Sequence, residues 1–211
     1  ERRRRTRDFT LNLLRFAIRE VIAAFPIYRT YVSGNGTMTA EDQRTIERAV
    51  TLARRRNPAS DLRVFDFLRD ILFGQATLVD EEDEEDRVRF VMRFQQLTGP
   101  VMAKGLEDTV FYRNARLTAL NEVGGDPAHF GATVEEFHAH NAQQLGRWPG
   151  ALLTSSTHDT KRSEDVRARI VTITEFPREW RAAVNRWSRQ NGRHRTRESG
   201  ESAPDRKDEA F

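Results

Sequence analysis

The run THDTKR, at residues 157–162, holds residue types that carbohydrate chemistry uses directly. The apolar stretch ALLTSS precedes it and a helical pattern follows, which is how the carboxyl end of a barrel strand presents catalytic groups. The candidate residues are His158, Asp159, Lys161 and Arg162. The Asp159 carboxylate can orient sugar hydroxyls or stabilise positive charge in an oxocarbenium-like transition state. A second interpretation stays open, in which Asp159 or Ser163 caps the following helix.

A second cluster of polar and aromatic residues lies earlier in the chain. Its members are Lys104, Glu107, Asp108, Tyr112 and Arg113, followed by Asn121 and Glu122 before a pair of glycines. Carbohydrate sites combine hydrogen-bonding groups for hydroxyls with aromatic faces for the apolar side of a sugar ring, and this segment offers both. Exposed salt bridges explain its charged residues equally well, because such pairs are common on protein surfaces.

Other site chemistries are disfavoured by spacing. His138 and His140 are two residues apart on a predicted helix, so they point to different faces and do not share a metal. The glycines of NEVGGDP do not follow the strand-loop-helix pattern of a phosphate site. We therefore expect no metal site and no cofactor.

Apolar periodicity and capping residues predict the elements that position these clusters. Helices are expected over about 8–25, 39–56, 60–73, a stretch after the acidic run 80–86 reaching 97, 133–148, from 163 onward, and from 177 to about 189. The segment after Gly99-Pro100 is expected to form strands and long loops, and ALLTSS a short strand. The fold class is therefore mainly α with a few short strands.

Composition limits the class of protein. The 211 residues include 35 basic and 32 acidic residues and no cysteine, which excludes disulfides and fits a cytoplasmic location. The apolar stretches are far shorter than the roughly 20 residues of a membrane span. The near balance of charge, with no helix that interleaves basic and aromatic residues, argues against a nucleic-acid partner. The start ERRRRTRD lacks an initiator Met, so we expect a piece of a longer polypeptide.

Several motifs together resemble a known enzyme family. They are GPVMAKGLEDTVFYR, LNEVGGDP, STHDTKRSEDVRARI and the earlier FPIYRTY. In order and spacing they are similar to the later part of the catalytic region of maltooligosyltrehalose synthases, in glycoside hydrolase family 13. The resemblance implies a fragment of a (β/α)8 barrel enzyme with a helical insertion. The expected division is a helical subdomain over 1–98, a partial barrel segment with active-site loops over 99–190, and a mobile tail over 191–211.

The resemblance also implies residue roles. It makes Asp159 the transition-state-stabilising carboxylate and His158 its hydroxyl-binding neighbour, whereas the family's nucleophile and acid/base belong to barrel strands that do not map onto this sequence. The implied substrate is a maltooligosaccharide. The remaining substrate-binding candidates are Lys104, Glu107, Asp108, Tyr112, Arg113, Lys161 and Arg162.

The expected activity belongs to the parent enzyme. That enzyme isomerises the reducing-end α-1,4 link of a maltooligosaccharide to an α,α-1,1 link, and the fragment alone is expected to be inactive. Its partners would be the sugar and the remaining barrel segments, with neither nucleic acid nor membrane. The alternatives are a helical module that binds oligosaccharide or protein without chemistry, and a basic helical module that binds nucleic acid.

Overall fold

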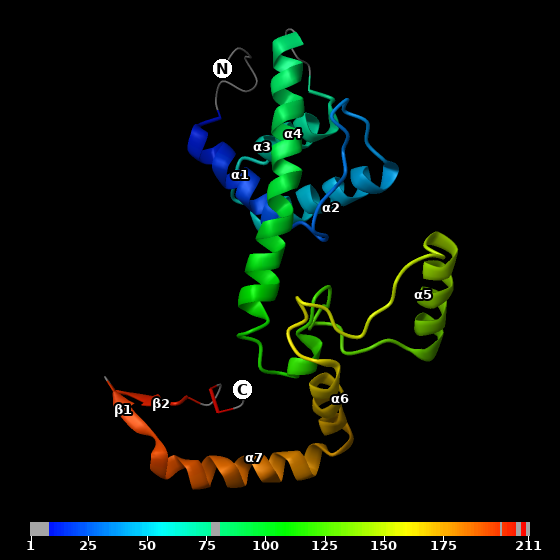
Figure 1. Cartoon of the computed structure of the whole chain (residues 1–211). Helices are drawn as coiled ribbons and strands as arrows, with labels where there is room; N and C mark the ends of the chain where they lie inside the picture. Colours follow the sequence, from blue (N-terminus) through cyan, green and yellow to red (C-terminus); the bar gives the residue numbers. More distant parts are fainter. Residues whose placement is uncertain (1–8, 77–80, 199, 206–207, 210–211) are drawn as a thin grey trace. The chain divides into compact units, whose positions relative to one another are not determined.

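The structure is a computed structural model of the chain and describes residues 9–76, 81–198, 200–205 and 208–209. Most of these residues are helical (Figure 1), which confirms the mainly α fold class. Contacts divide the chain into two compact units, Glu1–Asp108 and Thr109–Phe211, which we call unit 1 and unit 2. The functional division expected at residues 98 and 190 stays a prediction.

Unit 1 is a helical body around one hydrophobic core. Its helices are α1 (Leu11–Ala23), α2 (Ala40–Arg56), α3 (Arg63–Phe73) and α4 (Glu81–Met102). Helices α1, α2 and α3 pack against one another, and α1 and α3 also contact α4 (Figure 1). The core includes Ala17, Val21, Ile46, Val50, Phe65, Leu72, Val91 and Phe94. The apolar side chains of α1, whose periodicity predicts a helix here, therefore face this core.

Local signals set the ends of these helices as predicted. Thr39 and Asp42 form a reciprocal capping box at the start of α2, in which each side chain accepts a hydrogen bond from the other residue's backbone N–H. Gly74 ends α3 with φ +69°, a left-handed conformation that favours glycine. One end differs from the prediction, since the helix expected after the acidic run 80–86 already includes the acidic residues from Glu81 onward. Carboxylates suit the positive amino end of a helix.

Helix α4 contradicts the break expected at Gly99-Pro100. It continues through Pro100 to Met102 and leads into a π-helix, η1 (Ala103–Val110). Proline removes one backbone hydrogen bond and crowds the carbonyl four residues earlier, so it normally ends a helix. Here the preceding turn is held by the buried side chains of Phe94 and Thr98, and the wider π turns begin three residues after the proline. Packing has overridden the local signal.

A buried glutamine fixes the extended segment between α1 and α2. The Gln95 side-chain amide donates to the Val32 carbonyl at 2.9 Å and accepts from the Val32 N–H at 2.9 Å. Its oxygen also accepts from the Thr30 hydroxyl at 3.3 Å. Gln95 is 1% exposed and therefore satisfies the backbone of residue 32 as a neighbouring strand would.

Unit 2 is built from short helices and loops. Its elements are η2 (Thr118–Leu120), α5 (Val134–Arg147), α6 (Glu164–Thr172), η3 (Ile173–Glu175), α7 (Pro177–Asn191), η4 (Gly192–His194), β1 (Thr196–Glu198) and β2 (Glu201–Ala203). The two strands pair antiparallel, with Thr196 opposite Ala203. Thr133 and Glu136 form the predicted capping box of α5, and Pro177 occupies the first turn of α7.

The strand predicted at ALLTSS is wrong. Residues 151–156 lie outside regular structure, and Leu152 and Leu153 are 99% and 96% exposed. An extended apolar segment becomes a strand only beside a partner that pairs with its backbone, and β1 and β2 are the only strands in the described ranges. The partial barrel therefore stays a prediction.

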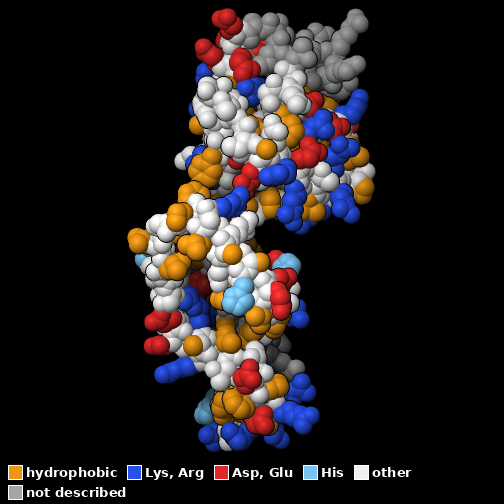
Figure 2. All heavy atoms as spheres, turned by 90° about the vertical axis from the view of Figure 1, so that its right-hand side faces the viewer, with side chains coloured by type: hydrophobic (Ala, Val, Ile, Leu, Met, Phe, Trp, Pro, Cys, Tyr) orange, Lys and Arg blue, Asp and Glu red, His pale blue; other side chains and the backbone are white. Residues whose placement is uncertain are grey.

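Unit 2 keeps much of its apolar side-chain surface exposed. Helices α5, α6 and α7 contain no buried residue. On α7, Trp180 and Trp187 are 41% and 43% exposed and pack edge to face with ring centres 5.7 Å apart. Figure 2 shows hydrophobic side chains at the surface of the chain. Across the described ranges, no helix combines the length and apolar character needed to cross a membrane.

Candidate functional site

The turn that carries Asp159 is ordered by its own threonines. The Thr160 hydroxyl donates to the Thr157 carbonyl at 2.9 Å, and the Asp159 N–H donates to the Thr157 hydroxyl at 3.3 Å. Helix α6 starts directly after the turn. Ser163 occupies its cap position but makes no capping hydrogen bond with its side chain, and the Glu164 N–H is bound by the Ser156 hydroxyl at 3.1 Å. The capping role considered for Ser163 is therefore wrong.

Asp159 and Lys161 form an asymmetric ion pair within this turn. The Lys161 Nζ lies 3.7 Å from Asp159 Oδ1, and the Lys161 side chain is 5% exposed whereas that of Asp159 is 58% exposed. An exposed carboxylate beside a buried ammonium group can accept hydrogen bonds from sugar hydroxyls. His158 is exposed, and its ring makes no hydrogen bond in the part of the chain that the structure describes.

The Glu122 carboxylate binds the far end of the same turn. Oε1 accepts from the backbone N–H groups of Lys161 and Val123, each at 2.9 Å. Oε2 accepts from the Arg167 guanidinium at 3.0 Å and from the Arg162 N–H at 3.5 Å. Burial raises the pKa of Glu122, but the hydrogen bonds from Val123, Lys161, Arg167 and Arg162 lower it more, so the pKa lies below its ordinary value.

The loop that presents Glu122 depends on a buried asparagine and a glycine. The Asn121 side chain, 2% exposed, donates to the carbonyls of Phe111 and Asn114 at 2.9 and 2.6 Å. The Gly125 N–H donates to the Glu122 carbonyl at 2.7 Å. A Cβ at Gly125 would lie 2.8 Å from that carbonyl oxygen and 2.9 Å from the Leu120 carbonyl oxygen, so no other residue fits without moving the backbone. The LNEVGGDP motif thus encodes a tight loop.

The other predicted cluster begins in unit 1, on the π-helix η1. Lys104 Nζ lies 2.6 Å from Asp108 Oδ2, and the Lys104 side chain is 78% exposed. Glu107 is 3% exposed and accepts a hydrogen bond from the Tyr28 hydroxyl. This contact ties the FPIYRTY segment to η1. Lys104 and Asp108 can reach solvent, whereas Glu107 is held against its own unit.

Tyr112 and Arg113 follow at the start of unit 2. Tyr112 is 54% exposed, Arg113 is also exposed, and neither side chain makes a hydrogen bond or ion pair within the described residues.

Of the predicted site residues, the structure brings together Asp159, Lys161 and the Arg162 backbone, in the turn that Glu122 binds. The central role of Glu122 and Arg167 was missed from the sequence, because their partners lie 39 to 45 residues away along the chain.

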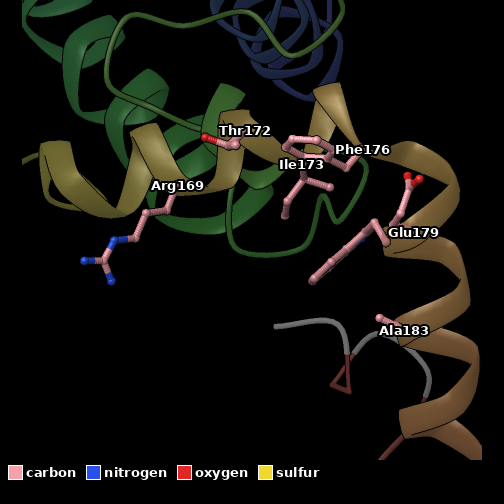
Figure 3. Close-up of a pocket in the computed structure, with 7 residues that line it drawn as sticks. Arg169, Thr172, Ile173, Phe176, Glu179 and Ala183 are labelled. Carbon is pink, nitrogen blue, oxygen red and sulfur yellow. The ribbon is translucent and has the colours of Figure 1, made fainter.

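A separate groove of about 300 Å³ lies along α6, η3 and α7 (Figure 3). It is lined by Arg169, Thr172, Ile173, Phe176, Glu179, Trp180 and Ala183. Figure 3 shows Ile173 and Phe176 beside one another, with Glu179 and Ala183 on α7. Its lining is largely apolar, and it contains none of the predicted site residues.

Comparison with known proteins gives relatives of one kind. No protein-family model matches the chain. A curated Mycobacterium tuberculosis protein, provisionally named maltooligosyl trehalose synthase, is 54% identical over 89 residues, which are 42% of this chain and 12% of that protein. The solved maltooligosyltrehalose synthase of Arthrobacter ramosus is 35% identical with a TM-score of 0.66, over 82% of this chain and 20% of that one.

A further solved structure is similar to the chain over the same extent. It is described as a hypothetical maltooligosyl trehalose synthase of Sulfolobus tokodaii, is 32% identical, and has a TM-score of 0.59. The match covers 82% of this chain and 20% of that one. The chain thus spans about one fifth of the solved synthases and 12% of the curated relative.

Proposed function

We propose, from the confirmed resemblance of this chain to part of the maltooligosyltrehalose synthases, that it forms an active-site segment of such an enzyme. The observation that carries the proposal is the match to the Arthrobacter ramosus synthase over 82% of the chain at a TM-score of 0.66. The parent enzyme would be an isomerase of trehalose biosynthesis in glycoside hydrolase family 13. It would convert the reducing-end α-1,4 link of a maltooligosaccharide to an α,α-1,1 link.

In this proposal Asp159 is the transition-state-stabilising carboxylate and His158 binds a hydroxyl beside it. Cleavage passes through a covalent glycosyl-enzyme formed by a nucleophile elsewhere in the parent, and retention at the transferred carbon follows from two displacements. The exposure of Asp159, at 58% of its side chain, supports a role in contact with substrate. The negative carboxylate stabilises the positive charge that develops on the sugar ring.

The released glucose must be held while water is kept out. We propose substrate contacts for Lys104 and Asp108 of unit 1 and, separately, for Tyr112, Arg113, Lys161 and Arg162 of unit 2. These residues offer hydrogen bonds to hydroxyls and one aromatic face. The exposure of Lys104 and Tyr112 supports direct contact with sugar. Buried Glu107 would act indirectly, by accepting the hydrogen bond of the Tyr28 hydroxyl and so fixing the position of η1.

The 211 residues alone would not catalyse this reaction, because the resemblance maps only one of the family's three carboxylates onto them. The barrel segments of a parent chain would supply the nucleophile and the acid/base. They would also cover the exposed apolar faces of unit 2. We place the parent in the cytoplasm, which the lack of cysteine supports.

A helical module that binds oligosaccharide or protein without chemistry is the second candidate. The groove beside Trp180 and Phe176 favours it, because these aromatic side chains are partly exposed along a largely apolar surface. Such a module would bind a sugar or a protein whether or not Asp159 is present.

A paired assay separates these proposals. A full-length protein that carries this segment, and the 211-residue chain, are each incubated with maltopentaose, and formation of a non-reducing product is measured. We expect activity only in the full-length protein, with a loss of several orders of magnitude in kcat on Asp159→Asn and an unchanged far-UV circular dichroism spectrum. Near-normal turnover of that variant would remove Asp159 from its role. Absence of a trehalose-type product from the full-length wild type would overturn the proposed reaction.

A further inference from the structure

Glu122 and Arg167 hold both ends of the turn that carries Asp159. Glu122 Oε1 accepts from the Lys161 N–H after Asp159, at 2.9 Å. Arg167 donates through one nitrogen to Glu122 Oε2 at 3.0 Å and through the other to the Ser155 carbonyl before the turn. We infer that the Glu122–Arg167 pair is a positioning device that sets the place of Asp159 and Lys161, an inference that rests on the proposed function for its catalytic consequence.

The hydrogen-bonding capacity of Glu122 is fully used by this arrangement. An ionised carboxylate offers about four acceptor sites. Four donors occupy them, namely the N–H groups of Val123, Lys161 and Arg162 and the guanidinium of Arg167. No site is left for a sugar hydroxyl or a transferred proton, so Glu122 acts through the residues it holds.

The position of Lys161 controls two parts of the site at once. Its backbone N–H is bound by Glu122, and its Nζ lies 3.7 Å from Asp159 Oδ1 although its side chain is 5% exposed. A shift of the Lys161 backbone therefore moves a buried cation relative to the Asp159 carboxylate. Catalysis is sensitive to such shifts, since a displacement of about 1 Å can cost on the order of 100-fold in rate.

The pair works only while Glu122 is charged. Glu122→Gln replaces one terminal oxygen by an NH₂ group. Each Glu122 oxygen accepts from two donors, so in either orientation of the amide the NH₂ group points at two N–H groups and cannot bind them. The partial burial of both side chains, 19% exposed for Glu122 and 20% for Arg167, prevents water from replacing the lost acceptor freely. Arg167 then loses its charged acceptor, and its link to the turn depends on the Ser155 carbonyl alone.

The test uses a full-length protein that carries this segment, with Glu122→Gln, Arg167→Lys and the control Glu175→Gln. Glu175 is an exposed carboxylate on η3 and makes no side-chain hydrogen bond in the described ranges. Hydrogen exchange of the peptide around Lys161 and Arg162 measures turn order, and kcat and KM for maltopentaose measure the consequence. For both test variants we expect exchange at least about tenfold faster, kcat lowered by about 10- to 100-fold and KM changed by less than about threefold.

Each outcome decides the inference separately from the proposed function. Exchange and kcat equal to those of Glu175→Gln would overturn it, and so would faster exchange with unchanged kcat, which marks a purely structural contact. If a test variant fails to fold, as seen by circular dichroism, the other variant decides. If the wild type makes no trehalose-type product, the proposed function fails, and the exchange rates alone decide whether Glu122 positions the turn.

Discussion

Replacement of Gln95 by leucine should remove a large part of the stability of unit 1. Leucine is similar in volume but offers no polar atom, so the N–H and the carbonyl of Val32 lose their partners at 2.9 Å. Val32 is 4% exposed, so water does not take their place. Each buried unsatisfied group costs about 1–3 kcal/mol, and the greater apolar burial of leucine returns roughly 1–2 kcal/mol. The expected net loss is about 1–4 kcal/mol, against a typical domain stability of roughly 5–15 kcal/mol.

Urea titration followed by far-UV circular dichroism measures this loss. With a slope of about 2 kcal/mol per molar, in the middle of the usual range, the midpoint should fall by about 0.5–2 M. All three tryptophans, at 148, 180 and 187, belong to unit 2, so their fluorescence follows that unit separately. Hydrogen exchange of the Val32 amide reports the lost contact directly.

The neighbouring glutamine supplies the matched control. Gln96 is exposed, and among the residues that the structure describes it accepts only an exposed hydrogen bond from Arg29 at 3.3 Å. Gln96→Leu should therefore change stability by less than about 0.5 kcal/mol. If Gln95→Leu and Gln96→Leu unfold at the same urea concentration, the strand-like role of Gln95 is refuted. Protection of the Val32 amide that survives Gln95→Leu would refute it as well.

Three other perturbations test the site. Gly125→Ala should lower the thermal midpoint of unit 2, read by tryptophan fluorescence, because its Cβ would meet two carbonyl oxygens at 2.8 and 2.9 Å. Gly150→Ala, in the same unit and with open space around the added Cβ, is the control. Lys104→Ala breaks an exposed ion pair, so it should lower the free energy of unfolding by less than about 1 kcal/mol. In a full-length protein it should nevertheless raise hydrolysis relative to trehalose formation. An unchanged product ratio would remove Lys104 from sugar binding. Because the pKa of Glu122 is lowered in the folded chain, its charge stabilises the turn fully above the ordinary pKa of 4.5, and this stabilisation is lost as pH falls through the lowered pKa. Hydrogen exchange at the Lys161 amide, corrected for intrinsic rates, should therefore stay slow at pH 5 and become faster only below about pH 4.5. Loss of protection already between pH 7 and 5 would contradict this.

Features of the fold that depend on neighbouring residues were predictable from sequence. The capping boxes at Thr39 and Thr133 and the glycine end of α3 follow from side chains within three or four positions. The continuation of α4 through Pro100 was not, since the packing of Phe94 and Thr98 decides it. Local signals set helix ends only where tertiary contacts do not oppose them.

The sequence indicates the exposed candidate residues better than the contacts that support them, and the roles of these residues stay predictions. Asp159 and Lys104 stand out by type and motif, and both side chains reach solvent. The contacts that hold the site join residues far apart in sequence, such as Tyr28 with Glu107, 79 positions away. For Glu122 a usable signal existed, because a glycine pair directly after Glu122 and Val123 marks a tight loop that fixes the acidic side chain.

The exposed leucines of unit 2 have a calorimetric consequence. The heat capacity of unfolding comes mainly from apolar surface that becomes hydrated, and Leu152 and Leu153 are hydrated already, at 99% and 96% exposure. Together with the unburied helices α5 to α7, they leave unit 1 as the main source of that signal. Binding of any polypeptide to these leucines would bury their apolar surface, so the heat capacity change of binding would be negative.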